Sequence, residues 1–143
     1  MTLHQIQNPA TFDPKIQTVQ GIYEAFGRGD VAYILDHITD DVDWASCPGS
    51  TIAPWHDVRN GKDGVTGFFQ ALASQLDVTE FTTLSFTSND TDVMTVTRFV
   101  ATSRTTGKTA AMDIHHWWRF RGDKVSFYRG TEDTAATAEI LRP

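Results

Sequence analysis

The feature that most constrains the fold is a change in the spacing of apolar side chains along the 143 residues. As far as residue 76, apolar residues recur at every third or fourth position, which is typical of amphipathic helices. From Phe81 onward they alternate with polar residues, as in strands that bury one face. Helices followed by successive strands predict an α+β fold. Without linkers, repeats or low-complexity tracts, residues 1–143 are expected to form one domain.

Three helices are expected in the first half of the chain. Asp13 is a suitable N-cap before Pro14, so the first helix should begin there and end at the glycines before Asp30. Asp30 is expected to cap a short second helix that carries Ile38, and Asp63 to cap a third. Strands are predicted at 42–46, after a polar turn at 40–41, and at 81–87, 93–103, 112–120 and 124–130.

Composition limits the partners and the setting of the chain. The formal net charge is −6 and there is no basic run, so binding to nucleic acid is not expected. No stretch approaches the ~20 apolar residues that span a bilayer. Residues 1–14 also lack the apolar run of a secretion signal. Cys47 is the one cysteine, so no disulfide can form within the chain, and a cytoplasmic location is expected.

The order of several short motifs resembles the SnoaL-like branch of the nuclear transport factor 2-like superfamily. The resemblance covers residues 14–134 and rests on Gly29-Asp30, residues 40–44, residues 60–65, Thr106-Gly107-Lys108, residues 116–120 and Tyr128-Arg129. It implies a cone-shaped α+β barrel, in which three N-terminal helices pack on a curved, mainly antiparallel sheet. The superfamily contains ketosteroid isomerases, polyketide cyclases, epoxide hydrolases, dehydratases and members without chemistry, so the fold does not settle the function.

The resemblance also orients the strands, because the family residue at the position of His116 points into the cone. Side chains alternate along a strand, so even-numbered residues 114–120 should face inward and odd-numbered residues 113–119 outward. The expected ligand-binding residues of an apolar pocket around His116 are Trp44, Ser46, Trp118 and Tyr128 from the strands, with Phe26, Trp55 and Phe69 closing the walls.

Known catalytic sets of the superfamily do not match this sequence. Alignment on Gly29-Asp30 places Ile22 at the phenol position of ketosteroid isomerase and turns Tyr23 about 100° away around the helix. Ser46 or Cys47 stands where that enzyme has its base, and His116 where it has its protonated Asp. The two Asp residues of limonene epoxide hydrolase correspond to Gly130 and a position near Val100, although Arg98 is close to the place of its Arg.

His116 is therefore the candidate catalytic residue. An imidazole titrates near neutral pH, and burial would lower its pKa and favour the neutral form. It could activate a water, protonate an enolate or hold a ligand carbonyl; alternatively it is a structural residue bonded to Tyr128 or to a backbone carbonyl. The remaining candidates are Cys47, a nucleophile if its thiolate is stabilised and otherwise an inert buried thiol, His56-Asp57 as a pocket lid or solvated surface, and Asp133 as a cap.

No cofactor and no metal site are expected. Asp113 and His115 share a strand face, but no third ligand with a recognisable spacing accompanies them, and His115 and His116 face opposite sides. The outward residues 113, 115, 117 and 119, together with Phe127 and Arg129, are too aromatic for free exposure. They predict a homodimer through the outer sheet face; alternatively, the segment after Thr134 covers this face.

Three functions remain open from the sequence. The first is a cofactor-free isomerase, cyclase, dehydratase or hydrolase acting on a small hydrophobic, oxygenated molecule. The second is a ligand-binding protein without turnover. The third is a protein-interaction domain whose interior is filled with side chains.

Overall fold

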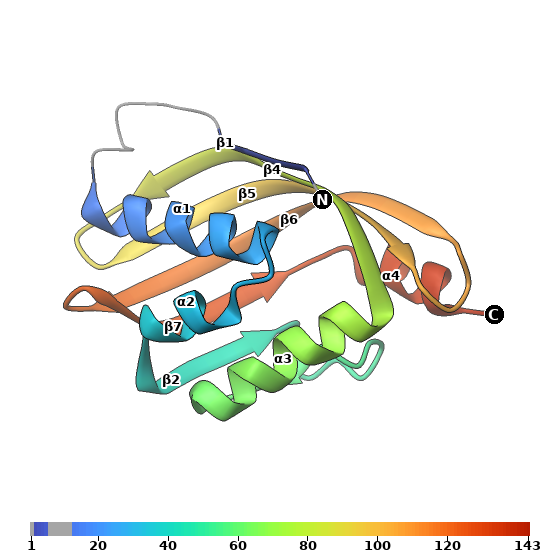
Figure 1. The fold of residues 1–143 in the computed structure, drawn as a ribbon, viewed down its shortest axis with the longest axis horizontal. Coiled ribbons are helices and arrows are strands. Elements are labelled where there is room, and N and C mark those ends of the chain that lie inside the picture. Colours follow the sequence, from blue (N-terminus) through green and yellow to red (C-terminus); the bar gives the residue numbers. More distant parts are fainter. Residues whose placement is uncertain (1, 6–12) are drawn as a thin grey trace.

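The computed structural model describes residues 2–5 and 13–143. Three helices come first: α1 (Pro14–Gly27), α2 (Val31–Asp36) and α3 (Gly61–Gln75). They lie on one side of a curved sheet, and a fourth helix, α4 (Thr134–Leu141), lies near the C-terminus (Figure 1). The expected α+β fold is confirmed, with one helix more than the three predicted. Among the described residues, no helix is both long and apolar enough to cross a lipid bilayer.

The sheet is an open row of seven strands rather than a closed barrel, in the order β1-β4-β5-β6-β7-β2-β3. The pairs β4–β5, β5–β6, β6–β7 and β2–β3 are antiparallel, whereas β1–β4 and β2–β7 are parallel. The sheet is thus mainly antiparallel, as predicted. The strands span β1 (Thr2–Gln5), β2 (Ile38–Ser46), β3 (Asp57–Val58), β4 (Leu76–Ser88), β5 (Asp92–Ser103), β6 (Thr109–Arg121) and β7 (Lys124–Thr131).

Most helix ends follow the capping residues predicted from the sequence. The side chains of Asp13, Asp30 and Asp133 each accept a hydrogen bond from a backbone N–H in the first turn of α1, α2 and α4. The prediction for Asp63 is wrong, because α3 already begins after Asn60. The Asn60 side chain instead accepts a hydrogen bond from Trp44 N at 2.9 Å, which ties the start of α3 to β2.

Two further predictions near the second helix are wrong. Ile38 belongs to β2 rather than to α2, and residues 40–41 lie within that strand rather than in a turn. The register of β2 against β7 shifts between Ile38 and Asp43, so this irregular stretch carries a polar pattern while remaining in the sheet. Asp40 and Asp41 form exposed ion pairs with Lys62 and Arg121.

The predicted alternation along β6 is confirmed. Ile114, His116, Trp118 and Phe120 are buried, whereas Asp113, His115 and Arg119 are exposed and Trp117 is half-buried. Tyr128 from β7 and Trp44 from β2 are buried beside Trp118. The inward faces of β6, β7 and β2 therefore place an aromatic cluster against the helices.

Candidate functional site

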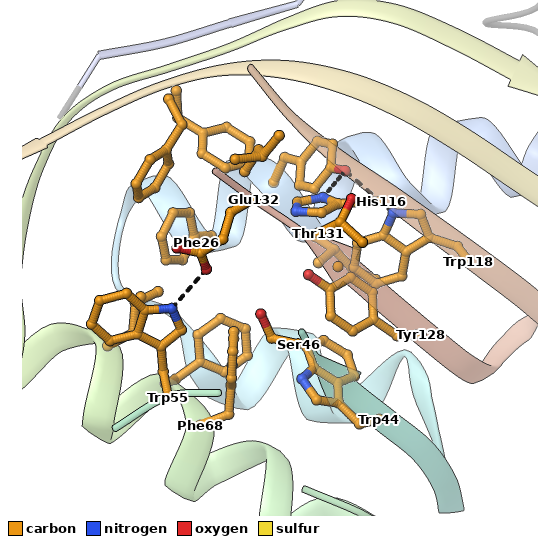
Figure 2. A pocket seen from close by; sticks show the side chains of 18 residues that line it. Phe26, Trp44, Ser46, Trp55, Phe68, His116, Trp118, Tyr128, Thr131 and Glu132 are labelled. Atoms are coloured by element: carbon orange, nitrogen blue, oxygen red, sulfur yellow. Dashed lines mark hydrogen bonds between the residues drawn. The ribbon is translucent and has the colours of Figure 1, made fainter. Parts of the chain in front are cut away.

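An aromatic pocket lies between α1, α3 and the inner face of the sheet. Its cavity volume is about 80 Å³. The structure brings all eight predicted site residues to its wall, so the strand alignment gave the correct orientation: Phe26, Trp44, Ser46, Trp55, Phe69, His116, Trp118 and Tyr128. Figure 2 shows His116, Trp118 and Tyr128 on one side of this space, with Ser46 and Trp44 next to them.

His116 is fixed by a hydroxyl from α1. Its Nδ1 lies 2.6 Å from the Tyr23 hydroxyl oxygen, which is also 2.8 Å from Thr95 Oγ1. Trp118 Nε1 donates to the same oxygen at 3.2 Å. Tyr128 contacts the His116 ring through its own ring, with 5.3 Å between the ring centroids. The partner of His116 is therefore Tyr23, rather than Tyr128 or a backbone carbonyl.

The hydrogen-bond donors of this network determine the tautomer of His116. The indole N–H of Trp118 can only donate, and Thr95 has no hydrogen-bond partner other than Tyr23 within the described part of the chain. If both groups donate to the Tyr23 oxygen, the phenol proton goes to His116 Nδ1, and the one donor left without a described partner is Nε2–H of His116, a residue of the pocket wall. The other arrangement leaves the Thr95 proton buried without an acceptor, which is costly. We therefore assign the ring proton of His116 to Nε2.

Burial keeps this network uncharged. Removal from water, with a smaller contribution from the neighbouring His115, lowers the pKa of His116 to about 3. Burial likewise raises the pKa of the Tyr23 phenol. At neutral pH, His116 is thus a neutral imidazole. Its Nε2 forms no hydrogen bond to another described residue, and the side chain borders the pocket.

The contribution of Tyr23 was not recognised from the sequence. The alignment gave the phenol position to Ile22, one residue earlier on α1. In the structure both side chains border the pocket, and Tyr23 is long enough for its hydroxyl to reach β6. An aromatic residue with a polar tip on the buried face of a helix is the signal that would have indicated this role.

Glu132 is a second polar group of the pocket wall that sequence reasoning missed. Its Oε1 accepts a hydrogen bond from Trp55 Nε1 at 3.0 Å (Figure 2). The same oxygen accepts one from His56 Nε2 at 2.9 Å, and Oε2 accepts one from Thr137. It follows Tyr128 and Gly130 at two-residue steps and is the first residue after β7, so the alternation of the strand, continued by one residue, would have placed it inward.

The partner of Glu132 is a buried imidazole, so a solvated surface position for His56 is wrong. Burial alone would lower the pKa of His56, but interaction with Cys47 and the hydrogen bond to Glu132 raise it to about 9. Burial alone would raise the pKa of Glu132, yet the hydrogen bonds from His56, Thr137 and Trp55 leave it below its ordinary value. The two side chains therefore form an ion pair at neutral pH.

Gly130 makes room for the pocket wall. A Cβ at this position would collide with the Tyr128 hydroxyl and would lie 3.5 Å from His116 Cδ2. Any larger residue would displace Tyr128, so the absence of a side chain here helps to define the shape of the pocket.

The outer face of β5–β7 carries its own network. Trp117 Nε1 and Arg119 Nε donate to Asp92 at 2.8 and 2.9 Å, and the hydrogen bonds from Arg119 and Trp117 lower the pKa of Asp92 to about 2. Phe127 packs on Trp117 with 4.8 Å between centroids, while Met94 remains 45% exposed. Helix α4 contacts the turn at 105–108 and leaves outward residues 113, 115 and 119 exposed, so it does not cover this face.

The family comparison agrees with this architecture. The SnoaL-like domain model matches residues 19–128, which is most of the chain. The chain therefore belongs to the SnoaL-like domain family, as the motif order indicated. No curated protein matches the chain.

Solved structures with the same fold have low sequence identity. An NTF2-like protein of unknown function from Burkholderia pseudomallei is 22% identical, with a TM-score of 0.85 over 92% of this chain and 99% of its own. TerC, co-crystallised with polyporic acid, is 24% identical, with a TM-score of 0.82 over 90% and 98%. A candidate polyketide cyclase from Xanthomonas campestris is 18% identical, with a TM-score of 0.74 over 90% and 97%. At such identities the likeness establishes the fold alone.

Proposed function

We propose that the protein binds a small, mainly apolar ring compound in the pocket and holds one oxygen of that compound on His116. The supporting observation is that a neutral imidazole, fixed by Tyr23 through Nδ1, borders a pocket lined mostly by aromatic rings. An apolar pocket with a few placed polar groups is typical of sites for small molecules. With its proton on Nε2, His116 would donate a hydrogen bond to a carbonyl or hydroxyl oxygen of the ligand.

His116 could act on a ligand either as a general base or as a hydrogen-bond donor to an oxygen, and its lowered pKa favours the second role. A general base works best when its pKa is near the working pH, and a pKa of about 3 lies far below that range. Glu132 also has a lowered pKa and is already bonded to three donors. The site therefore favours polarisation of a ligand oxygen over proton abstraction by a strong base. Ligand binding is the activity it supports best.

Matched ligands test this proposal. 1-Tetralone carries a ketone on a two-ring skeleton, and tetralin has the same skeleton without oxygen. Because one neutral hydrogen bond contributes ~0.5–1.5 kcal/mol, wild-type protein should bind 1-tetralone several-fold more tightly in calorimetric titrations. In His116→Leu this preference should disappear while tetralin still binds. Failure of both compounds to bind, or an unchanged preference in His116→Leu, would contradict the proposal.

A second candidate function is cofactor-free isomerisation of a bound ketone through its enol, in which His116 Nε2–H stabilises the developing enolate oxygen and solvent water takes the proton from the α-carbon. The observation in its favour is the Thr95–Tyr23–His116 chain, which holds the imidazole in one orientation and presents its Nε2 proton as a polarising group. The test is deuterium exchange at the carbon beside the carbonyl of 1-tetralone, followed by NMR in D₂O. Wild type should accelerate the exchange relative to His116→Leu; equal rates would leave binding without turnover.

We further propose that the protein forms a homodimer through the outer sheet face and works in the cytoplasm. The exposed Met94 beside the Trp117–Phe127 pair supports the first statement. The free thiol of Cys47, which has no second cysteine to pair with, supports a reducing compartment.

A further inference from the structure

Three metal-ligating side chains from distant parts of the sequence meet at one end of the sheet. β7, β2 and β3 are neighbours, and Ser46 pairs with Gly130 on one side and with Asp57 on the other. Cys47 follows the last residue of β2, His56 precedes β3, and Glu132 follows β7. The strand register therefore delivers a thiol, an imidazole and a carboxylate to the same place.

The donor atoms of these three residues are close enough to share one ion. One sulfur, one ring nitrogen and one carboxylate oxygen all lie within 4.8 Å of one another. Donor atoms bound to one tetrahedral zinc ion, at ~2.0–2.3 Å each, lie roughly 3.3–3.8 Å apart. The three donor atoms therefore lie within roughly 1–1.5 Å of the spacing that a tetrahedral zinc ion requires.

Neighbouring side chains hold the donors in position. Ser50 Oγ lies 2.7 Å from His56 Nδ1, so Nε2 would be the ligand nitrogen, with the metal ion replacing the proton that Nε2 donates to Glu132. Thr137 and Trp55 donate to the two oxygens of Glu132. Such outer contacts orient the ligands of metal sites and fix the tautomer of a ligating histidine. The His56 side chain is fully buried and that of Glu132 is 12% exposed, so both are well ordered by packing.

The backbone on either side of the cluster is unusual. Cys47 and Asp57 have φ angles of 45° and 78°, in the left-handed region that residues other than glycine rarely adopt. Asp57 Oδ1 accepts a hydrogen bond from Gly49 N at 3.0 Å, which links the turn after Cys47 to the loop that carries His56. Disfavoured conformations of this kind gather at functional sites, where the surrounding structure maintains them.

We propose that Cys47, His56 and Glu132 form a binding site for zinc or a similar divalent transition-metal ion. Thiolate, imidazole and carboxylate are the ligands zinc takes in proteins, and three of them leave the fourth position of a tetrahedral ion open. Glu132 and the adjacent residues Ser46 and Trp55 border the pocket, so the open position would be filled from the pocket by water or by an oxygen of a ligand. The site does not depend on the ligand proposed above.

Metal binding to the wild-type chain is the direct test. Purified protein, stripped with a chelator, is titrated with Co²⁺ under reducing conditions and then with Zn²⁺. One equivalent of Co²⁺ should give a thiolate-to-cobalt charge-transfer band and the intense visible bands of a four-coordinate ion. Zn²⁺ should then abolish both. Weak visible bands without the charge-transfer band would overturn the proposal, because they would indicate an ion bound without the thiolate.

Substitutions show whether all three residues take part. Cys47→Ser, His56→Gln and Glu132→Gln should each weaken Zn²⁺ binding by at least about tenfold, the scale at which even outer-shell losses are felt. The exposed His115→Gln and Glu24→Gln are the matched controls and should bind as wild type does. Loss of Zn²⁺ binding in Cys47→Ser with full binding in Glu132→Gln would overturn the proposal, since the thiol alone would then account for the binding. If His56→Gln fails to fold, Cys47→Ser, Glu132→Gln and the cobalt spectrum still decide.

Discussion

Replacing His116 by Gln tests whether burial keeps this imidazole neutral. The pKa of His116 is about 3 in the folded chain, against about 6.5 for an exposed histidine in the unfolded chain. Below pH 6.5 the unfolded chain takes up a proton at this residue and the folded chain does not. His116 therefore lowers the free energy of unfolding progressively as the pH falls from 6.5 towards 3, and has no such effect above pH 6.5.

The two pKa values set the size of the effect. One pH unit inside this window is worth about 1.4 kcal/mol. Lowering the pH from 7.5 to 5.0 should therefore reduce the free energy of unfolding of wild type by about 2 kcal/mol more than that of His116→Gln. The raised pKa of His56 acts in the opposite direction, because its stabilisation is present below pH 6.5 and is lost as the pH rises through 9. That contribution is common to both proteins and cancels in the comparison.

Urea unfolding followed by tryptophan fluorescence measures this difference, since Trp44 and Trp118 are buried next to His116 and its neighbours. His115→Gln is the matched control, because it removes an exposed imidazole from the adjacent position of β6 and should retain the larger drop. An equal pH dependence in wild type and His116→Gln would refute the reasoning. It would mean that the folded chain accepts the proton as readily as the unfolded one.

Three further predictions follow from single contacts. Tyr23→Phe should lower the free energy of unfolding by about 2 kcal/mol, because Trp118 N–H and His116 Nδ1 lose their buried partner; urea unfolding at pH 7.5 measures it, and a neutral effect would contradict the network. Gly130→Ala should weaken 1-tetralone binding, because the new Cβ displaces Tyr128. An unchanged affinity in calorimetry would contradict this, because it would show that Tyr128 can move without changing the pocket. Met94→Glu should convert the proposed dimer to monomer in sedimentation velocity, since Met94 is exposed on the outer face; an unaltered dimer would place the interface elsewhere.

The orientation of the site could be predicted from the sequence because strand alternation is local. Once His116 is taken as inward, its neighbours on β6 follow at two-residue steps, and the buried Trp118 agrees. The same two-residue step leads from Gly130 to Glu132. However, a glycine carries no hydrophobic signal, and the strand was predicted to end at Gly130. Glu132 was thus overlooked although its position was predictable.

Other features depend on contacts that no local pattern encodes. The meeting of Cys47, His56 and Glu132 requires the parallel pairing of β2 with β7, which brings together residues 85 positions apart in the case of Cys47 and Glu132 (132 − 47). Metal sites recognisable from sequence have short, regular ligand spacings, and the three residues of the proposed site have none. The sequence predicted a cap at Asp133 but not helix α4, because the apolar residues of this helix form no clear stripe.

A crystal structure of the protein soaked with 1-tetralone tests the central claim most directly. The account predicts the ring system between the aromatic side chains of the pocket, with the ketone oxygen ~2.7–3.2 Å from His116 Nε2. A bound ketone whose oxygen points away from His116, or a ligand that binds only outside the pocket, would contradict it.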